Sequence, residues 1–584
     1  MTAMHQGTPR PPKNILGLSF MYHDSAAVLM SDGLVVAAAA EERFSRLKHS
    51  LDFPENAIVF CLDFGGLSIE DIDAVVFYEK PLLKFERILT MTVSAFPRGL
   101  GLFLNSIPLW LKYKLFIRDM IRSHTGYQGR IYFADHHYAH AASAFFPSGF
   151  EEAAILTMDG VGEWATMTRG TGSGNRITLS HEIRYPHSLG LLYSTVTAFL
   201  GFRVNGGEGK VMGLASYGQP RFYDLMMRDL IDLKPDGSFR MNLKYFSFYK
   251  ELVMYSPRFV TAFGPARIPE SAVTSRDEDL AASLQKVLET VALTAARSLH
   301  QDTGLKKICI AGGVGLNSVA NGRILQELDY EDIFIQPAAG DDGGAIGSAL
   351  YLHHQVFNGA RQWRMLHPFL GPAYDKKEVR RFLELRHAPH LVFEDDHALI
   401  ERVAEDLAQG RIVGWLQGRM EYGPRALGNR SILANPQLPD MKEVLNRKVK
   451  HREPFRPFAP AVLVERAGEY FEPNFPSPFM LLVNRTRPEK RDLLPAVTHV
   501  DGTARIQTVS REQNPLFYDL IARFGEKTGV PVILNTSFNI RGEPIVCDYG
   551  DALECFLNTE MDCLALENCY LLKEEVQRKG FSAK

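Results

Sequence analysis

The stretch Asp135-His-His-Tyr-Ala-His-Ala-Ala-Ser-Ala-Phe-Phe-Pro-Ser148 decides the fold around it, because it joins three histidines to a run of small and apolar residues. Such a run is typical of the buried side of a helix. Residues four apart lie on one helix face, so His136 and His140 can point at one ion. His137 lies about a third of a turn away and is the weaker ligand candidate.

A carboxylate usually completes a metal site that begins with a His-x-x-x-His pair. The nearest one along the chain is Asp159, in Ile155-Leu-Thr-Met-Asp-Gly-Val-Gly162. There an apolar run of strand type breaks into a glycine-rich turn, which leaves the acid at the carboxyl end of the strand. The pattern predicts a metal site; the alternative is a helix whose histidines are solvated or satisfied in the core.

Length and composition indicate an ordinary globular protein of more than one domain. The chain has 584 residues, 46% of them hydrophobic, and a net charge of -3, so no overall charge favours nucleic acid. None of the six cysteines forms a Cys-x-x-Cys pair, which indicates reduced thiols. Met1 to Asn14 is polar, and the apolar stretch Leu100 to Leu111 is too short to span a bilayer. We expect a cytoplasmic protein without a membrane span.

Two similar openings predict a duplicated α/β fold. Strands are expected over Asn14 to Phe20, Ala26 to Met30 and Leu34 to Ala40, and again over Ala153 to Met158, Trp164 to Thr168 and Arg176 to His181. Each triplet is followed by helical segments, a plan typical of the superfamily of actin, sugar kinases and heat-shock ATPases. Between the triplets, Lys80 to His124 predicts amphipathic helices. The pattern favours packing on the sheet or lining a pocket over membrane contact.

Glycine-rich turns follow several predicted strands of the first segment. Asn205 to Ala215 contains Gly-Gly-Glu-Gly-Lys, Lys307 to Ala311 runs into Gly312-Gly-Val-Gly-Leu-Asn317, and Ile333 to Gln336 runs into Pro337-Ala-Ala-Gly-Asp-Asp-Gly-Gly-Ala345. A strand, a glycine turn and a helix start can place an anion at the helix N-terminus. Together with the turn after Asp159, these loops favour a nucleotide-type ligand.

The second segment begins near His367-Pro-Phe-Leu-Gly-Pro372 and differs in character. Arg411 to Leu416 predicts a strand. Arg419 to Arg456 holds nine Lys or Arg against four acids, interleaved with Gly, Pro and Phe. This spacing fits a compact pocket for a polyanion better than a nucleic-acid surface.

The motifs together resemble the O-carbamoyltransferases of the NodU and TobZ type, the nodulation and tobramycin carbamoyltransferases. The resemblance runs from about Asn14 to Leu572. It is carried by His-His-Tyr-Ala-His-Ala-Ala-Ser-Ala-Phe, Met-Asp-Gly-Val-Gly-Glu, Gly-Glu-Gly-Lys-Val-Met-Gly-Leu-Ala, Gly-Gly-Val-Gly-Leu-Asn, Glu-Tyr-Gly-Pro-Arg-Ala-Leu-Gly-Asn-Arg-Ser-Ile, Arg-Glu-Pro-Phe-Arg-Pro-Phe-Ala-Pro and Asn-Thr-Ser-Phe-Asn. It implies a TsaD-like, actin-fold domain over residues 14–360 and an α/β, YrdC-like domain over residues 366–575.

The resemblance also implies a two-step reaction. The second domain would make carbamoyl adenylate from carbamoyl phosphate and ATP, with Mg²⁺ expected alongside ATP. The first would transfer the carbamoyl group to a hydroxyl of a sugar, glycan or secondary metabolite. The implied metal is Fe(II) or another divalent transition metal, and a homodimer is compatible with the family.

Matching motif to motif places each implied role on residues of this sequence. The metal ligands would be His136, His140, Asp159 and Asp341, with Asp342 as an alternative to Asp341. His23 would be the base for the acceptor hydroxyl, with Lys48 a neighbouring catalytic charge. Arg425, Lys450, Arg456, Arg505, Asn535 and Ser537 would hold carbamoyl phosphate and ATP. The glycine loops contribute further candidates for nucleotide binding, namely Gly207, Glu208, Lys210, Gly313 and Asn317.

Two alternatives remain open on the sequence. One is an enzyme like the tRNA threonylcarbamoyltransferases, which would need a basic RNA-binding face that the net charge does not indicate. The other is a non-catalytic regulator that binds nucleotide, which turnover of carbamoyl phosphate would exclude. The residues do not distinguish one acceptor from another.

Overall fold

Two five-stranded sheets with the same strand pattern build the first domain of the computed structural model, which describes residues 11–581. The strand orders are β3-β2-β1-β4-β5 and β8-β7-β6-β11-β12. In each sheet the first three strands in chain order pair antiparallel, and the last two join in parallel. This repeated topology is the duplicated actin-like plan that the sequence predicts.

The strand bounds agree closely with the predicted apolar runs. The first sheet contains β1 (Asn14–Ser19), β2 (Ala26–Ser31), β3 (Leu34–Ala40), β4 (Ala74–Phe77) and β5 (Arg130–Phe133), and the second contains β6 (Glu152–Met158), β7 (Ala165–Ser173), β8 (Arg176–Arg184), β11 (Lys307–Ala311) and β12 (Asp332–Ile335). Strand β7 continues five residues beyond the predicted end at Thr168. It does so because its pairing with both β6 and β8 extends to Ser173.

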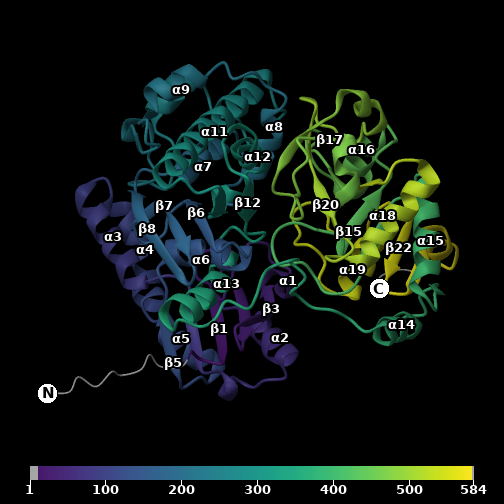
Figure 1. The fold of residues 1–584 in the computed structure, drawn as a ribbon. Coiled ribbons are helices and arrows are strands. Elements are labelled where there is room, and N and C mark those ends of the chain that lie inside the picture. The colour runs from purple at the N-terminus through teal and green to yellow at the C-terminus, as the bar shows by residue number, and fades with distance from the viewer. Residues whose placement is uncertain (1–10, 582–584) are drawn as a thin grey trace.

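Two helices lie between these sheets and bring the halves together (Figure 1). Helix α6 (His136–Ser148) packs on β6 and β11, and α13 (Asp342–Leu350) packs on β1 and β2. Helix α6 ends at Gly149, whose φ of 76° suits glycine. The two helices approach so closely that a Cβ on Gly347 would lie 1.8 Å from the carbonyl oxygen of Ala139. Gly347 therefore sets the distance between them.

Helices over the remaining faces complete the first domain. They are α1 (Glu42–Ser45), α2 (Glu55–Gly65), α7 (Leu189–Phe199), α8 (Glu208–Ala215), α9 (Tyr223–Asp229), α10 (Pro257–Phe263), α11 (Ser275–Thr303) and α12 (Ser318–Glu327), with a small hairpin of β9 (Ile231–Leu233) and β10 (Phe239–Met241). The long helix α11 begins at a capping box formed by Thr274 and Asp277 and ends before Gly304. It packs against α8 and α12.

The segment from Lys80 to His124 forms helices as predicted, but it does not pack as expected. It contains α3 (Pro81–Ser94), α4 (Leu100–Leu109), the π-helix η2 (Trp110–Lys114) and α5 (Ile117–Thr125). Helix α5 buries Ile117 and Ile121, whereas α4 buries none of its residues. The expected packing of an apolar side into the core is therefore wrong for α4, because its contacts with α3 leave Leu102, Phe103 and Ile107 only half-buried.

The second domain is α/β, as predicted, and contains an eight-stranded mixed sheet of order β13-β23-β22-β14-β15-β21-β16-β20. Its strands are β13 (Leu391–Val392), β14 (Val413–Leu416), β15 (Arg430–Ala434), β16 (Ala459–Leu463), β20 (Gln507–Val509), β21 (Val532–Ser537), β22 (Cys563–Leu566) and β23 (Cys569–Leu572), and a smaller sheet joins β17 (Phe471–Glu472), β18 (Val483–Thr486) and β19 (Thr503–Arg505). Helices α14 (Lys376–Leu385), α15 (Asp396–Ala408), α16 (Met441–Val444), α18 (Pro515–Thr528) and α19 (Tyr549–Leu557) surround the large sheet.

The two domains share a packed interface. The predicted boundary near residues 360–366 falls between η5 (Tyr351–Val356) and α14. Tyr422, Leu427 and Phe455 of the second domain belong to the hydrophobic core of the first. The predicted polar tail from Met1 lies mainly outside the described residues. Within residues 11–581, no helix is both long and apolar enough to cross a membrane.

Candidate metal centre and anion pocket

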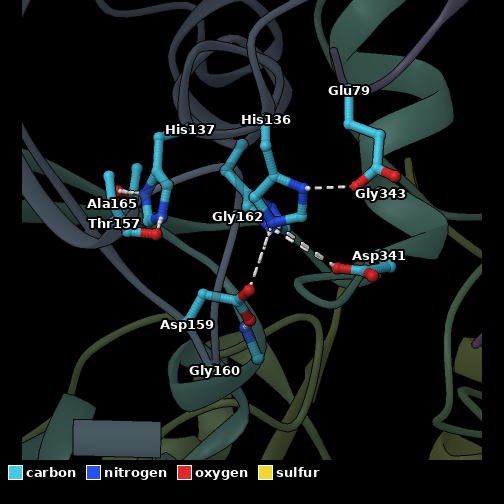
Figure 2. Close-up of polar contacts among 12 residues, drawn as sticks. Glu79, His136, His137, Thr157, Asp159, Gly160, Gly162, Ala165, Asp341 and Gly343 are labelled. Atoms are coloured by element: carbon cyan, nitrogen blue, oxygen red, sulfur yellow. Dashed lines mark hydrogen bonds and ion pairs between the residues drawn. The ribbon is translucent and has the colours of Figure 1, made fainter. Parts of the chain in front are cut away.

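Four buried side chains converge where α6, β6 and α13 meet. The Nε2 atoms of His136 and His140 lie 3.1 Å apart, and Asp159 Oδ2 lies 3.1 Å from His136 Nε2. Asp341 Oδ1 lies 3.7 Å from each imidazole Nε2. Ligands held about 2.1 Å from a tetrahedral ion are about 3.4 Å apart, so these spacings fit a single metal ion. Figure 2 shows His136, Asp159 and Asp341 turned toward one point.

The electrostatics of this cluster favour a central cation. Burial by itself lowers the pKa of His136, but the hydrogen bond to Asp159 and the charges of Asp341 and Asp159 raise it to about 9. Burial raises the pKa of Asp159, yet the facing histidines hold it well below its usual range. Both pKa shifts show that the carboxylates stabilise positive charge where the four side chains meet. The Nδ1 atoms of His136 and His140 have no hydrogen-bond partner among the described residues, so Nε2 is the ligating nitrogen that this geometry presents.

Backbone contacts fix the two carboxylates. Asp159 follows β6, and its Oδ1 accepts a hydrogen bond of 3.0 Å from Gly313 N–H. Asp341 precedes α13, and its Oδ2 accepts a hydrogen bond of 3.2 Å from Tyr78 O–H. Of the two neighbouring acids, Asp341 shares the cluster with the histidines. Asp342 instead accepts from Gly343 N–H, and desolvation followed by the charge of Asp24 raises its pKa.

Several neighbours of the cluster were not identified from the sequence. Glu79 Oε2 lies 4.0 Å from His136 Nδ1 and pairs with buried Lys84. Glu163 accepts the backbone N–H of His136 at 3.1 Å. Glu79 follows the apolar strand β4 just as Asp159 follows β6, and this repeated position is the signal that could have found it.

His137 makes its hydrogen bonds away from the cluster, as expected of the weaker candidate for a metal ligand. Its Nδ1 lies 2.6 Å from Thr157 Oγ1, and its Nε2 lies 2.9 Å from the carbonyl oxygen of Ala165. Desolvation, helped by the charges of His136 and His140, lowers its pKa to about 3. His137 is therefore a neutral core histidine (Figure 2).

The turn after β1 places His23 beside the cluster. His23 Nε2 lies 3.8 Å from Asp341 Oδ2, and His23 Nδ1 lies 2.8 Å from Asp24 Oδ2. The other oxygen of Asp24 lies 2.7 Å from His49 Nδ1. Asp24 and His49 both have left-handed φ values, 56° and 57°. Such conformations are costly for residues with a Cβ, and here they bring one carboxylate between two imidazoles.

Lys48 is exposed at the edge between the domains. Its pKa is lowered by desolvation first and then by the charges of Arg43 and Arg456. Arg456 belongs to the second domain. The charge of Lys48, in the first domain, therefore interacts with a charge of the second domain.

The glycine loop before α8 is held largely by its own residues. Gly207 caps the helix, and a Cβ there would lie 2.6 Å from the carbonyl oxygen of Arg203. Glu208 accepts hydrogen bonds from the backbone N–H groups of Asn205 and Gly206 at 3.1 and 2.9 Å. Lys210 Nζ reaches the second domain and lies 2.8 Å from Glu453 Oε1.

The other two nucleotide candidates of the first domain also make internal contacts. Gly313 N–H is bound to Asp159, as described above. The Asn317 side chain caps α12 by accepting from Ala320 N–H at 3.0 Å, and it exchanges two hydrogen bonds with Gln285. Nucleotide binding by these loops stays a prediction.

A group of cationic side chains gathers in the second domain. We call Arg425, Arg452, Arg456 and Arg505 the arginine cluster. All four are partly buried, and within the described chain none forms an ion pair. Desolvation and then the charges of the other three hold the pKa of Arg505 well below its usual range. Arg452 was missed as a candidate, although it lies in a quoted motif.

The remaining predicted residues of this domain surround Lys450. The Lys450 ammonium donates to the carbonyl oxygen of Ser537, and it lies 3.1 Å from Asn539 Oδ1. Its pKa is held well below the usual range by desolvation and by Arg452. Asn535 Nδ2 donates to Gln507 Oε1 at 2.8 Å, while Asn535 Oδ1 has no partner among the described residues.

Fold and site together define a two-domain α/β protein. One domain holds a metal-capable His/Asp cluster, and the other holds arginines that form no ion pair within residues 11–581. The family model described as "Carbamoyltransferase N-terminus" matches residues 14–350, and "Carbamoyltransferase C-terminus" matches residues 404–573. The chain therefore belongs to the carbamoyltransferase family, and it is a carbamoyltransferase enzyme.

Relatives extend over most of the chain. An uncharacterized protein of Synechocystis sp. is 48% identical over 96% of this chain and 97% of its own length. Nodulation protein NolNO of Sinorhizobium fredii is 39% identical over 94% of this chain and 79% of its own length. Among solved structures, the ROK hexokinase of Thermus thermophilus is 16% identical with a TM-score of 0.27, over 58% of this chain and 98% of that one. That structural likeness is too weak to support an argument.

Proposed function

We propose that this carbamoyltransferase makes carbamoyl adenylate in its second domain and transfers the carbamoyl group to an acceptor hydroxyl in its first. The acceptor would be a small molecule or a glycan. The single observation that carries the proposal is the arginine cluster, whose four guanidinium groups form no ion pair within residues 11–581. The charge of Glu453 reaches Arg452 and Arg456, but its carboxylate pairs with Lys210. Uncompensated buried charge is costly, so a polyanionic substrate is the natural counter-charge.

The second domain's residues would bind and orient the two phosphate substrates. Planar guanidinium forks suit bidentate contacts with phosphate, and Arg425, Arg456 and Arg505 are free to make them. Lys450 lies among the same charges, and it would add a further donor as its contacts with Ser537 and Asn539 rearrange. Water would first hydrolyse carbamoyl phosphate to carbamate and phosphate. A carbamate oxygen would then attack the α-phosphorus of ATP, which forms carbamoyl adenylate and releases pyrophosphate.

The His/Asp cluster would hold a divalent transition metal, Fe(II) on the family's pattern, through His136, His140, Asp159 and Asp341. When bound, such an ion supplies a Lewis acid that polarises an oxygen of the adenylate. Glu79, 4.0 Å from His136 Nδ1, orients that imidazole from behind.

The His23 imidazole would accept the proton of the acceptor hydroxyl. Asp24 contacts His23 Nδ1 and would fix the tautomer whose Nε2 takes the proton. Desolvation lowers the pKa of His23, but the charges of Asp341 and Asp24 raise it well above its ordinary value, so the base form would be reached above neutral pH. In this arrangement the Asp24 carboxylate would orient the imidazole that acts as the base. Lys48, at the edge of the interface, would contribute positive charge on the path of the adenylate between the domains.

The proposal is tested by separating the two half-reactions. Arg425→Ala and Arg456→Ala are each expected to lose carbamoyl phosphate-dependent exchange of pyrophosphate into ATP, because each removes a phosphate fork. His136→Ala is expected to keep the exchange and lose transfer to a panel of hydroxylated acceptors followed by mass spectrometry.

A matched control is Arg466→Ala, which removes an exposed arginine paired with Glu469 in the same domain. It should leave both steps unchanged. If Arg425→Ala kept full exchange, or if His136→Ala abolished both steps equally, the division of labour would be wrong.

A further inference from the structure

Helix α3 buries its two basic side chains and exposes several apolar ones, together with Glu86. Lys84 and Arg87 are buried, and Arg87 donates to the carbonyl oxygen of Gly162 at 2.8 Å. On the opposite side, Leu82 and Val93 are 73% and 77% exposed. A surface helix of a globular protein normally has the reverse arrangement. Burial in the core therefore does not account for the apolar side of α3.

The apolar surface continues through the turn into α4 and η2. Phe96 in the turn is 70% exposed, Leu104 in α4 is 58% exposed and Leu111 in η2 is 56% exposed. We call the set that these helices share the outer apolar face; it comprises Leu82, Leu89, Val93, Phe96, Leu100, Leu104, Leu109 and Leu111. Single exposed leucines need no explanation, but a set gathered on consecutive elements that contact one another marks an interaction surface. Figure 1 shows α3 and α4 at the outer edge of the first domain, away from the second.

Basic residues border this face. From Leu82 to Arg118 the chain has six Lys or Arg and one acid, Glu86. Lys84 and Arg87 are buried and Lys114 is half-buried, whereas Glu86 is exposed. Arg98, Lys112 and Arg118 are exposed. An amphipathic helix with aliphatic and aromatic residues on one side and bases around them is typical of a segment that lies in a membrane interface.

We propose that the outer apolar face docks, in the plane of the surface, on a bilayer that contains anionic lipids. The apolar side chains would enter the acyl boundary, and Arg98, Lys112 and Arg118 would contact lipid phosphate. Charge favours this occupant over a second copy of the chain, because a two-fold contact would bring the same bases together. Docking of this kind needs no membrane-spanning helix.

The inner side of the same helices borders the transfer site. Lys84 and Lys114 lie over the ring of Tyr22, with their Nζ atoms 4.5 and 5.6 Å from its centroid. Tyr22 directly precedes His23. This consequence rests on the proposed function: docking places the acceptor end of the reaction at the bilayer surface, where an amphiphilic hydroxylated acceptor would lie.

The test is co-sedimentation of the full-length protein with vesicles of phosphatidylcholine alone or of phosphatidylcholine with phosphatidylglycerol. We expect binding to the anionic vesicles, little binding to the neutral ones, and release at high salt. Because no substrate is present, the result is independent of carbamoyl transfer.

Variants locate the contact. Val93→Glu and Leu104→Glu, in exposed positions, are expected to lower the partition into anionic vesicles about tenfold or more, since each removes apolar area and adds a repelled charge. The matched control is Leu385→Glu, at a leucine that is 71% exposed on α14 of the second domain. It should bind as the parent does.

Two results would overturn the proposal. One is a parent protein that does not bind anionic vesicles, or variants that bind as well as the parent. The other is a parent that sediments as a dimer in centrifugation without lipid and becomes monomeric in Val93→Glu, which would make the outer apolar face a contact between copies.

Discussion

One carboxylate, Asp24, organises two histidines at the edge of the His/Asp cluster. Its oxygens lie 2.8 and 2.7 Å from His23 Nδ1 and His49 Nδ1, and its backbone adopts a left-handed conformation. Strain of this kind persists only where the surroundings hold it in place. The conformation of Asp24 therefore decides how His23, the proposed base, is oriented toward the acceptor.

We expect His23→Asn to lower carbamoyl transfer by about 100- to 10,000-fold, the usual contribution of a positioned base. Asp24→Asn should have a smaller effect in the same step, about 10- to 100-fold, because the imidazole remains but its tautomer is no longer fixed. The measurement is single-turnover transfer from preformed carbamoyl adenylate as a function of pH. A His23→Asn enzyme within a few-fold of the parent and with an unchanged pH profile would exclude the base role.

Metal content provides the second test at this scale. The double variant His136→Ala/His140→Ala should lose the bound transition metal, because it removes both imidazole ligands. Inductively coupled plasma mass spectrometry of the purified protein measures the occupancy. His181→Ala, which changes an exposed histidine on β8, is the control and should keep the parent's metal content. Equal occupancy in the double variant would exclude the assigned ligands.

At the scale of elements, the turn between β22 and β23 buries an acid. Glu567 is only 7% exposed, and its Oε1 accepts Gly418 N–H at 2.8 Å. Desolvation raises its pKa to about 7, although Arg430 opposes this shift. The folded protein thus holds this proton more tightly than the unfolded chain, whose glutamate has a pKa of about 4.3. Stability is therefore lost as the pH rises from about 4 to 7.

Glu567→Gln is expected to remove that loss while keeping the acceptor for Gly418 N–H. The variant should match the parent near pH 4 and become more stable above pH 7, by about 4 kcal/mol at most. Urea unfolding at several pH values measures the difference. A stability difference that stays constant with pH would show that Glu567 does not titrate as its burial implies.

At the scale of the whole molecule, the segment Glu421 to Arg425 connects the two sites. Tyr422 O–H donates to the carbonyl oxygen of Asp342, next to the metal cluster. Arg43 donates to the carbonyl oxygen of Gly423 at 2.8 Å. Arg425, two residues further on, belongs to the arginine cluster. The same short segment therefore contacts the start of α13 beside the His/Asp cluster and contributes Arg425 to the arginine cluster.

Gly423→Ala should loosen this docking. Gly423 has a φ of 121°, and a Cβ there would lie 2.9 Å from the carbonyl oxygen of Pro337 in the first domain. We expect a loss of about 1–3 kcal/mol and a greater decrease in transfer than in pyrophosphate exchange. Calorimetry and the two half-reaction assays measure these effects. Gly529→Ala is the control, because that glycine also has a positive φ but faces open space; equal effects of the two changes on transfer would exclude a docking role.

The sequence by itself determined the elements and most of the candidate site. The apolar runs and glycine turns predicted both strand triplets, because strand formation depends on a local pattern of side chains. The four-residue spacing of His136 and His140 placed both on one helix face. The strand-end position of Asp159 predicted the third ligand of the cluster.

Only the tertiary structure decided the relations between distant segments. Asp341 is separated from His140 by about 200 residues of chain, and the close approach at Gly347 is what brings them together. Arg452 gained its place in the same way, through contacts that no local pattern encodes. The outer apolar face is the clearest case: amphipathic periodicity shows that a helix has an apolar side, but only its neighbours determine whether that side is covered.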